Sequence, residues 1–427
     1  MMIDDLNRFF YIPTCLLFFA RYLPSTALPI ALVRDVKSSA TVTGLVVSMI
    51  GLGKMIMDLP AGHLIKSLGI SVSFTISASL MTGASLLMFV YPGLTIMFVG
   101  MGLFGMGMAV FQVGRQELLV NSVSEELRPR VAAFVGAVSR FGTIFAPVIG
   151  ALIFDLSGGL RLVFLLQGLL AWASLWGLLS KPYENLAQIS ATTATHMTAY
   201  EIIKEFRQPL FTSGVFMNGL QILRESRRLI VPIVGHRLGW SVESISFLLS
   251  LSYAVDFATC FAADKLFALK GLKFASWVTA SLFCLSLVSL ALSALNDGFL
   301  WFGGILAGVA NGSASGISLL LGSEIAKPSV GPMFYSVWRL ITDTGEFLGP
   351  IVTGVLVDVL PIHAALLVIA GIGVGGAYVY AGCDVKAFAV AVWLTPVGRP
   401  VQERSYELVG KTPMMSVESS PTASIHK

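Results

Sequence analysis

The chain has 427 residues, of which 55% are apolar and only 12% are charged, and its formal net charge is +4. A soluble protein normally carries about a quarter charged residues, so this composition excludes a soluble domain and predicts an integral membrane protein that resides in a lipid bilayer. The small positive charge gives no case for a nucleic-acid partner.

Apolar runs long enough to cross a bilayer, about 20 residues each, occur in two sets of six. The first set is predicted near residues 9–33, 41–65, 70–91, 94–118, 132–155 and 160–180. The second set is predicted near residues 209–236, 243–267, 273–294, 299–322, 334–357 and 361–381. The expected fold class is therefore an all-α integral membrane protein with twelve transmembrane helices. They form two pseudo-symmetric six-helix bundles, 1–181 and 209–382, with a cytoplasmic linker at 182–208 and a cytoplasmic tail at 383–427.

The distribution of Lys and Arg predicts the orientation. If the N-terminus lies inside, sixteen basic residues fall in cytoplasmic segments and only four, Arg34, Lys37, Arg161 and Arg237, fall in outer loops. Cytoplasmic loops carry the excess of Lys and Arg, so both termini are expected in the cytoplasm. The plasma membrane is the default location, a vacuolar or plastid membrane stays open, and a monomer is expected.

The chain also contains a long-range repeat. A displacement of 203 residues carries Arg21 onto Arg224 and Gly142 onto Gly345, and a displacement of 202 carries Gly69 onto Gly271. In membrane proteins built from such repeats, the substrate lies at the interface between them. Transport is therefore the first functional hypothesis.

Two stretches resemble signatures of a known family. The stretch that includes Asp58, Pro60 and Gly62 and ends at Gly69 resembles the signature between helices 2 and 3 of the major facilitator superfamily. The stretch Gly142–Gly150 resembles the helix-5 signature of its twelve-span drug–proton antiporter branch. Where the first signature continues with an acid, this chain has Lys66, and the branch's helix-4 signature of Arg followed by Gln-Gly is absent.

The resemblance implies the major facilitator fold and transport by alternating access. Small residues let helices approach closely, and proline bends a helix, which a rocking mechanism would use. The predicted helix-packing residues are Asp58, Pro60, Gly62, Gly69, Gly142, Pro147, Gly150, Gly345, Gly349 and Pro350.

Buried charges predict a gate between the halves, because an ionisable residue near the bilayer centre marks a functional site. In the repeat, Lys54 falls opposite Asp256 and Arg140 falls opposite Asp343. The superfamily fold packs helix 2 on helix 11 and helix 5 on helix 8. We therefore expect ion pairs Lys54–Asp343 and Arg140–Asp256 that hold the cytoplasmic side shut, so that exchanging the charges of Lys54 and Asp343 restores function. The alternative is pairing within one half, for instance Lys54 with Asp58.

A second set of charges predicts anion recognition. Arg21 and Arg224 are equivalent in the repeat and lie on helices 1 and 7, which line the central cavity in this superfamily. Two converging guanidinium groups would suit a carboxylate or a phosphate. The alternative is that Glu225 and Asp58 neutralise these arginines and leave a largely apolar cavity. The predicted substrate-contacting residues are Arg21, Gln112, Arg115, Asn218, Gln221, Arg224, Glu225 and Arg228.

Three functions follow. The first is proton-coupled efflux of a small organic compound, with Glu225 as the first choice of proton carrier among the buried acids. The second is uptake or exchange of an organic anion through the Arg21/Arg224 pair, and the third is a non-transporting membrane receptor. Neither the cysteines nor the histidines have the spacing of a metal site or of a catalytic centre, so no metal, no cofactor and no enzyme activity are expected.

Overall fold

The computed structural model describes residues 11–122, 128–175, 198–325 and 332–382. These residues contain helices and no strand. The helices of the first half are α2 Ile12–Tyr22, α3 Ala27–Arg34, α4 Ala40–Val90, α5 Leu94–Ser122, α6 Arg128–Ser157 and α7 Arg161–Ala173. The later helices are α8 Ala199–Glu205, α9 Arg207–Arg237, α10 Val242–Ala291, α11 Asp297–Ser313, α12 Ile317–Ile325, α13 Pro332–Val359 and α14 Ile362–Ala381.

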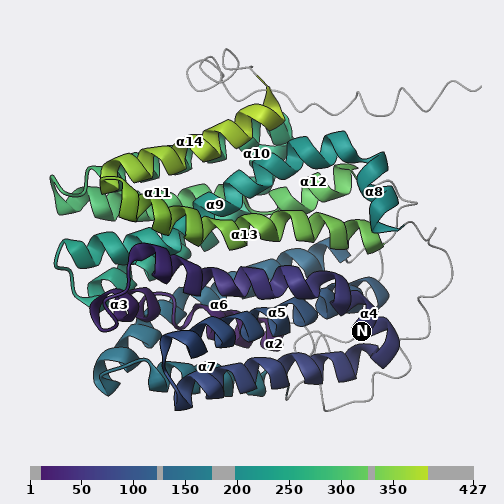
Figure 1. Ribbon diagram of the computed structural model, residues 1–427. Coiled ribbons are helices and arrows are strands. Elements are labelled where there is room, and N and C mark those ends of the chain that lie inside the picture. Colours follow the sequence, from purple (N-terminus) through teal and green to yellow (C-terminus); the bar gives the residue numbers. More distant parts are fainter. Residues whose placement is uncertain (1–10, 123–127, 176–197, 326–331, 383–427) are drawn as a thin grey trace, which may run out of the picture. The chain divides into compact units, whose positions relative to one another are not determined.

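The helical chain forms one compact unit up to Asp384, within which the blue helices of the first half lie together and the green helices of the second half lie together (Figure 1). The predicted boundary between the halves falls in residues 176–197, and both this segment and the predicted tail lie outside the described residues. Of the predicted linker, the structure describes α8, whose N-terminus has a capping box between Thr198 and Glu201.

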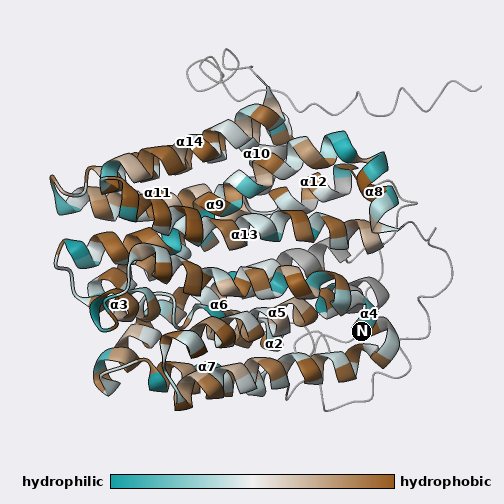
Figure 2. Cartoon of the chain, in the orientation of Figure 1, coloured by the Kyte–Doolittle hydropathy of each residue, from teal (hydrophilic) through white to brown (hydrophobic). Residues whose placement is uncertain are grey.

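Nine stretches of the described residues are long and apolar enough to cross a membrane. Hydrophobic residues, in brown, dominate these helices, while hydrophilic residues, in teal, lie at helix ends and at a few places inside the bundle (Figure 2). Three of the expected spans are not long or apolar enough to be counted among these nine, each for a reason that the structure shows. Helix α7 is described for only 13 residues, α9 carries three arginines in its middle, and α11 is separated from α12 by a turn at Gly316. The all-helical membrane fold is thus as predicted, while the count of twelve stays a prediction.

Two long helices each contain two spans joined at a glycine. Gly69 in α4 has φ +81° and Gly271 in α10 has φ +78°, a backbone conformation that favours glycine. These two residues are the pair related by the sequence repeat. The expectation that Gly69 packs helices is wrong, because a Cβ atom there would meet no described atom within 4 Å, and the residue forms the turn between spans instead.

The glycines of α6 and α13 bring these helices against their neighbours. A Cβ atom at Gly142 would lie 2.6 Å from the carbonyl oxygen of Cys15 in α2, and one at Gly345 would lie 2.8 Å from the Cα of Asn218 in α9. Gly150 and Gly349 make the next contacts along the same two helix pairs, and Pro147 and Pro350 lie buried inside α6 and α13. The sequence repeat is therefore also a repeat of helix packing. Gly62 takes no part in the packing of the described helices, since a Cβ atom there would meet none of their atoms within 4 Å, and Pro60 is exposed.

The halves meet closely where α4 crosses α13. Gly51 in α4 lies so close that a Cβ atom would come within 2.7 Å of the backbone nitrogen of Phe347. At the end of the same crossing, Asp358 accepts hydrogen bonds from the backbone nitrogen of Ala40 at 3.0 Å and from that of Thr41 at 2.8 Å. The Thr41 hydroxyl adds a third at 2.6 Å. We call Asp358, Ala40 and Thr41 the outer clasp, because they lie on the outer side in the predicted orientation.

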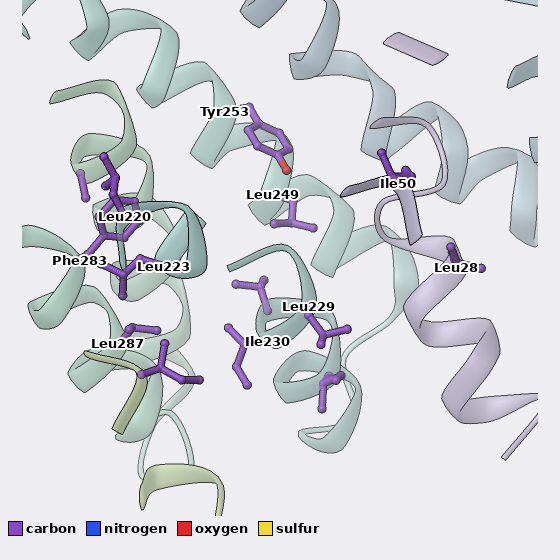
Figure 3. Packing of buried hydrophobic residues seen from close by; sticks show 14 of the residues in the cluster. Leu28, Ile50, Leu220, Leu223, Leu229, Ile230, Leu249, Tyr253, Phe283 and Leu287 are labelled. Atoms are coloured by element: carbon purple, nitrogen blue, oxygen red, sulfur yellow. The ribbon is translucent and has the colours of Figure 1, made fainter. Parts of the chain in front are cut away.

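One apolar core connects the two halves. Its buried members include Leu28 and Ile50 from the first half, and Leu229 and Leu249 from the second. Figure 3 shows these side chains together with others of the same cluster. This shared core holds the two halves together through apolar contacts, which are not covalent.

We predict that Gly51→Ala lowers the melting temperature of the purified protein while Gly62→Ala does not. Overpacking at a backbone contact costs about 1–3 kcal/mol, whereas replacing an unconstrained helical glycine stabilises by about 0.5–1 kcal/mol. Thermal unfolding in detergent measures both variants. Equal melting temperatures would show that the α4–α13 crossing is not tightly packed.

Candidate functional site

A cavity of about 360 Å³ lies between the helices of both halves. Among the described residues, seven basic and four acidic side chains line it. The basic ones are Arg21, Lys54, Arg140, Arg224, Arg227, Arg228 and Arg339, and the acidic ones are Glu225, Asp256, Asp343 and Glu346. A cavity this charged inside a membrane protein needs nearly every charge to be paired.

A network of ion pairs joins α4 to α13. The Nζ of Lys54 lies 3.1 Å from Asp343 and 2.7 Å from Glu346. The Nη2 of Arg339 lies 3.2 Å from Asp58 and 3.6 Å from Asp343. Lys54 thus pairs with Asp343 across the boundary between the halves, as expected, and its alternative partner Asp58 pairs with Arg339 of the opposite half.

Arg21 completes this network and is not available as a free cation. Its guanidinium group forms an ion pair with Glu346 of α13 and lies 5.6 Å from the ring centre of Tyr22. The expected symmetric pair of Arg21 and Arg224 therefore does not form. The sequence repeat could not reveal this, because Glu346 falls opposite Thr143 and has no charged counterpart.

A second contact joins α6 to α10. The Nε of Arg140 lies 3.3 Å from Asp256, and the Asn311 side chain donates a hydrogen bond of 2.5 Å to the other oxygen of the same carboxylate. Glu225 forms its ion pair within α9, with Arg228 at 2.5 Å.

Two guanidinium groups on α9 have only neutral partners among the described residues. Arg224 donates to the side-chain oxygen of Gln221 at 2.9 Å and to the carbonyl of Ala314 at 3.0 Å. Arg227 donates to the hydroxyl of Ser252 at 3.2 Å and lies 4.8 Å from the ring centre of Tyr253. The Nε atoms of both arginines are buried without a hydrogen-bond partner in the described part of the chain.

The other predicted contact residues divide into two groups. Gln221 and Gln112 line the cavity, and Gln112 accepts a hydrogen bond from Arg339 at 2.9 Å. Arg115 and Asn218 do not line it. The Arg115 side chain donates to Thr14 at 3.2 Å, and Asn218 donates to the backbone of α13, so both connect helices instead.

Arg339 is the functional residue that sequence reasoning missed. It falls opposite Gly136 in the repeat, so comparison of the halves gives no signal. Its spacing of four residues from Asp343 on one helix was the available sign, because residues at i and i+4 lie on the same face.

Comparison with known proteins places this arrangement in a family. A profile of the Major Facilitator Superfamily matches residues 10–330. The chain belongs to the major facilitator superfamily. This makes it a multi-pass membrane protein and a secondary transporter, and not an enzyme. The match is to the superfamily as a whole, and the drug–proton antiporter branch is not singled out.

Solved structures of other superfamily transporters share the fold. A nucleoside transporter has a TM-score of 0.68 and 15% identity, over 89% of this chain and 98% of its own. A POT family transporter in complex with 5-aminolevulinic acid has a TM-score of 0.72 and 11% identity, over 91% and 96%. A D-xylose-proton symporter has a TM-score of 0.70 and 15% identity, over 89% and 98%. A search of curated proteins gave no match. At these identities the likeness shows the fold alone.

We predict that exchanging the charges of Arg140 and Asp256 restores the transport that either single change abolishes. A buried ion pair with one partner removed leaves an uncompensated charge and costs about 3–5 kcal/mol. Asn311 is compatible with the exchange. Its amide oxygen has no partner among the described residues, and rotation of the amide group would turn this oxygen toward an arginine at position 256. Substrate uptake in proteoliposomes measures the two single variants and the double.

The same exchange at Lys54 and Asp343 is a poorer test than the sequence suggested. Lys54 also contacts Glu346, and Asp343 also contacts Arg339, so exchanging them would place like charges next to each other.

If the Arg140/Asp256 double variant is as inactive as the single ones, the pair does not act as a unit.

Proposed function

We propose that this transporter carries a small organic anion across the membrane by alternating access, with Arg224 as the anion-binding residue. The observation that carries the proposal is the pattern of pairing in the cavity. Arg21, Lys54 and Arg339 meet three carboxylates, and Arg140 and Arg228 meet one each. After these pairs are made, Arg224 and Arg227 remain with neutral partners only.

The energetic cost of such a cation supports a role in binding. A charged side chain near the bilayer centre costs about 3 kcal/mol even on the most lenient scale. Gln221 and the carbonyl of Ala314 orient the Arg224 guanidinium without cancelling its charge. A carboxylate or phosphate on a substrate would supply the missing countercharge, and a planar guanidinium group suits both.

The cavity is of a size and chemistry that fit a small polar compound. Its volume falls in the lower part of the range for small-molecule sites, about 300–1,000 Å³. Phe18, Tyr22, Met217 and Tyr253 provide apolar surface beside the charges. The excess of basic over acidic side chains favours an anion over a lipophilic cation, which disfavours the drug-type substrate that the resemblance suggested.

Alternating access is part of the proposal. The ion pairs Lys54–Asp343 and Arg140–Asp256 each join one helix of the first half to one helix of the second, so the halves could separate only by breaking both. The outer clasp joins α4 and α13 beyond them. We propose that the ion pairs close the cytoplasmic side and that the outer clasp closes the other, so that each opens in turn.

Direction, location and oligomeric state complete the proposal. Export rests on the stretch Gly142–Gly150 alone. The plasma membrane, with both termini in the cytoplasm, rests on the distribution of Lys and Arg. A monomer suffices, because the two halves of one chain complete the cavity.

We predict that Arg224→Gln reduces transport of organic anions by about 10- to 100-fold at low substrate concentration. Loss of a charge-assisted hydrogen bond removes about 1.5–3 kcal/mol of binding. The measurement is uptake in proteoliposomes of labelled carboxylates, phosphate esters and lipophilic cations. The control is Arg237→Gln, which removes an exposed arginine from the end of the same helix and should leave transport unchanged.

Transport of anions that survives Arg224→Gln would overturn the assignment of this residue. Transport of lipophilic cations in preference to anions would overturn the substrate class. In that second case, the arginines would be structural and the proton-coupled export of drug-like compounds would become the better hypothesis.

A further inference from the structure

Among the buried acids of the described chain, Asp58 is the least satisfied. Its side chain is fully buried, and neither carboxylate oxygen accepts a hydrogen bond from another described residue. Within the described part of the chain its one ion pair is with Arg339 of α13, at 3.2 Å. Glu346, by contrast, meets two cations, and Asp256 meets one cation and one amide. An ionised carboxylate with so little support is costly to keep inside a protein.

Arg339, the partner of Asp58, is already divided among three groups. The same Nη2 atom lies 3.2 Å from Asp58, 3.6 Å from Asp343 and 2.9 Å from the side-chain oxygen of Gln112. A small movement would therefore let Arg339 leave Asp58 and close on Asp343. Because Asp58 is on α4 and Arg339 is on α13, that movement breaks a contact between the two halves.

The groups that surround Asp58 come from three helices. Helix α13 presents Arg339 and Asp343, α4 presents Lys54 one turn away, and α5 presents Gln112 beside Arg339. The carboxylates of Asp58 and Asp343 lie against the same Nη2 atom of Arg339, at 3.2 Å and 3.6 Å. Two ionised carboxylates that share one cation repel each other, so their proximity is more favourable when one of them holds a proton.

We propose that Asp58 binds the proton that this transporter couples to the movement of its anion. The inference rests on the proposed function and names its coupling ion and site. A proton adds to a carboxylate oxygen of Asp58 and makes this side chain neutral. Arg339 loses its attraction to α4 and moves toward Asp343. The α4–α13 boundary weakens on the cytoplasmic side, and loss of the proton restores the ion pair.

Glu225, the first expectation from the sequence, fits this role less well. Its ion pair with Arg228 at 2.5 Å lies within one helix, so protonation of Glu225 would break no contact between the halves. Protonation of Asp58 breaks one directly.

The test compares exchange with driven accumulation in proteoliposomes that contain the full chain. In the intact protein, a pH gradient drives accumulation of a labelled organic anion, and preloaded vesicles also exchange it without a gradient. In Asp58→Asn we expect exchange to continue near the intact rate while accumulation driven by the gradient is lost. The control, Asp297→Asn, removes an exposed acid from the start of α11 and should keep both.

Each contrary result has a separate meaning. Driven accumulation that persists in Asp58→Asn overturns the assignment of the proton site. Exchange without any response to pH in the intact protein overturns proton coupling and leaves the anion proposal intact. Absence of any anion movement in the intact protein overturns the proposed function first.

A second variant and a second measurement decide the case in which Asp58→Asn is simply inactive. Asp58→Asn combined with Arg339→Gln also removes the cation that loses its partner on α4 in the single variant, and we expect the double variant to exchange the anion without responding to pH. Infrared difference spectra of the detergent-solubilised protein between low and high pH need no substrate. They should contain a protonated-carboxyl band that Asp58→Asn removes. A band that is unchanged in this variant would overturn the inference.

Discussion

The rest of the structure depends on the need to pair buried charges across the boundary between two halves. Three cations and three carboxylates form one neutral network on α2, α4 and α13: Arg21, Lys54, Arg339, Asp58, Asp343 and Glu346. Neither half could bury its share of these charges alone without a large desolvation cost. The network therefore holds the halves together in this conformation. If the halves separate, the desolvation cost requires that these charges find new partners.

The pairing also explains why the functional residues are not symmetric although the chain is repeated. Arg21 and Arg224 occupy equivalent positions, but Glu346 is present on α13 and its counterpart, Thr143, carries no charge. Arg21 is thereby committed to the boundary, and Arg224 stays open to the cavity. The repeat supplies two similar scaffolds, and Glu346 alone gives Arg21 an ion pair that Arg224 lacks in the described part of the chain, which is the asymmetry on which the proposed anion site depends.

The sequence repeat located backbone features that match between the two halves, although it did not reveal the role of each. Gly69 and Gly271 are related by the repeat and adopt the same turn, and Gly142 and Gly345 make matching close contacts on neighbouring helices. Residues that occur in one half only were beyond this reasoning. Arg339 and Glu346 have uncharged counterparts, and whether Asn218 faces the cavity or α13 depends on helix rotation, which spacing alone does not fix.

A structure with a transported anion bound would test the central claim most directly. We expect the anionic group to lie on the guanidinium of Arg224, with Arg227 nearby and with the ion pair between Arg21 and Glu346 intact. An anion bound to Arg21, with Glu346 displaced, would contradict the division of roles and would restore the symmetric site that the sequence alone suggested.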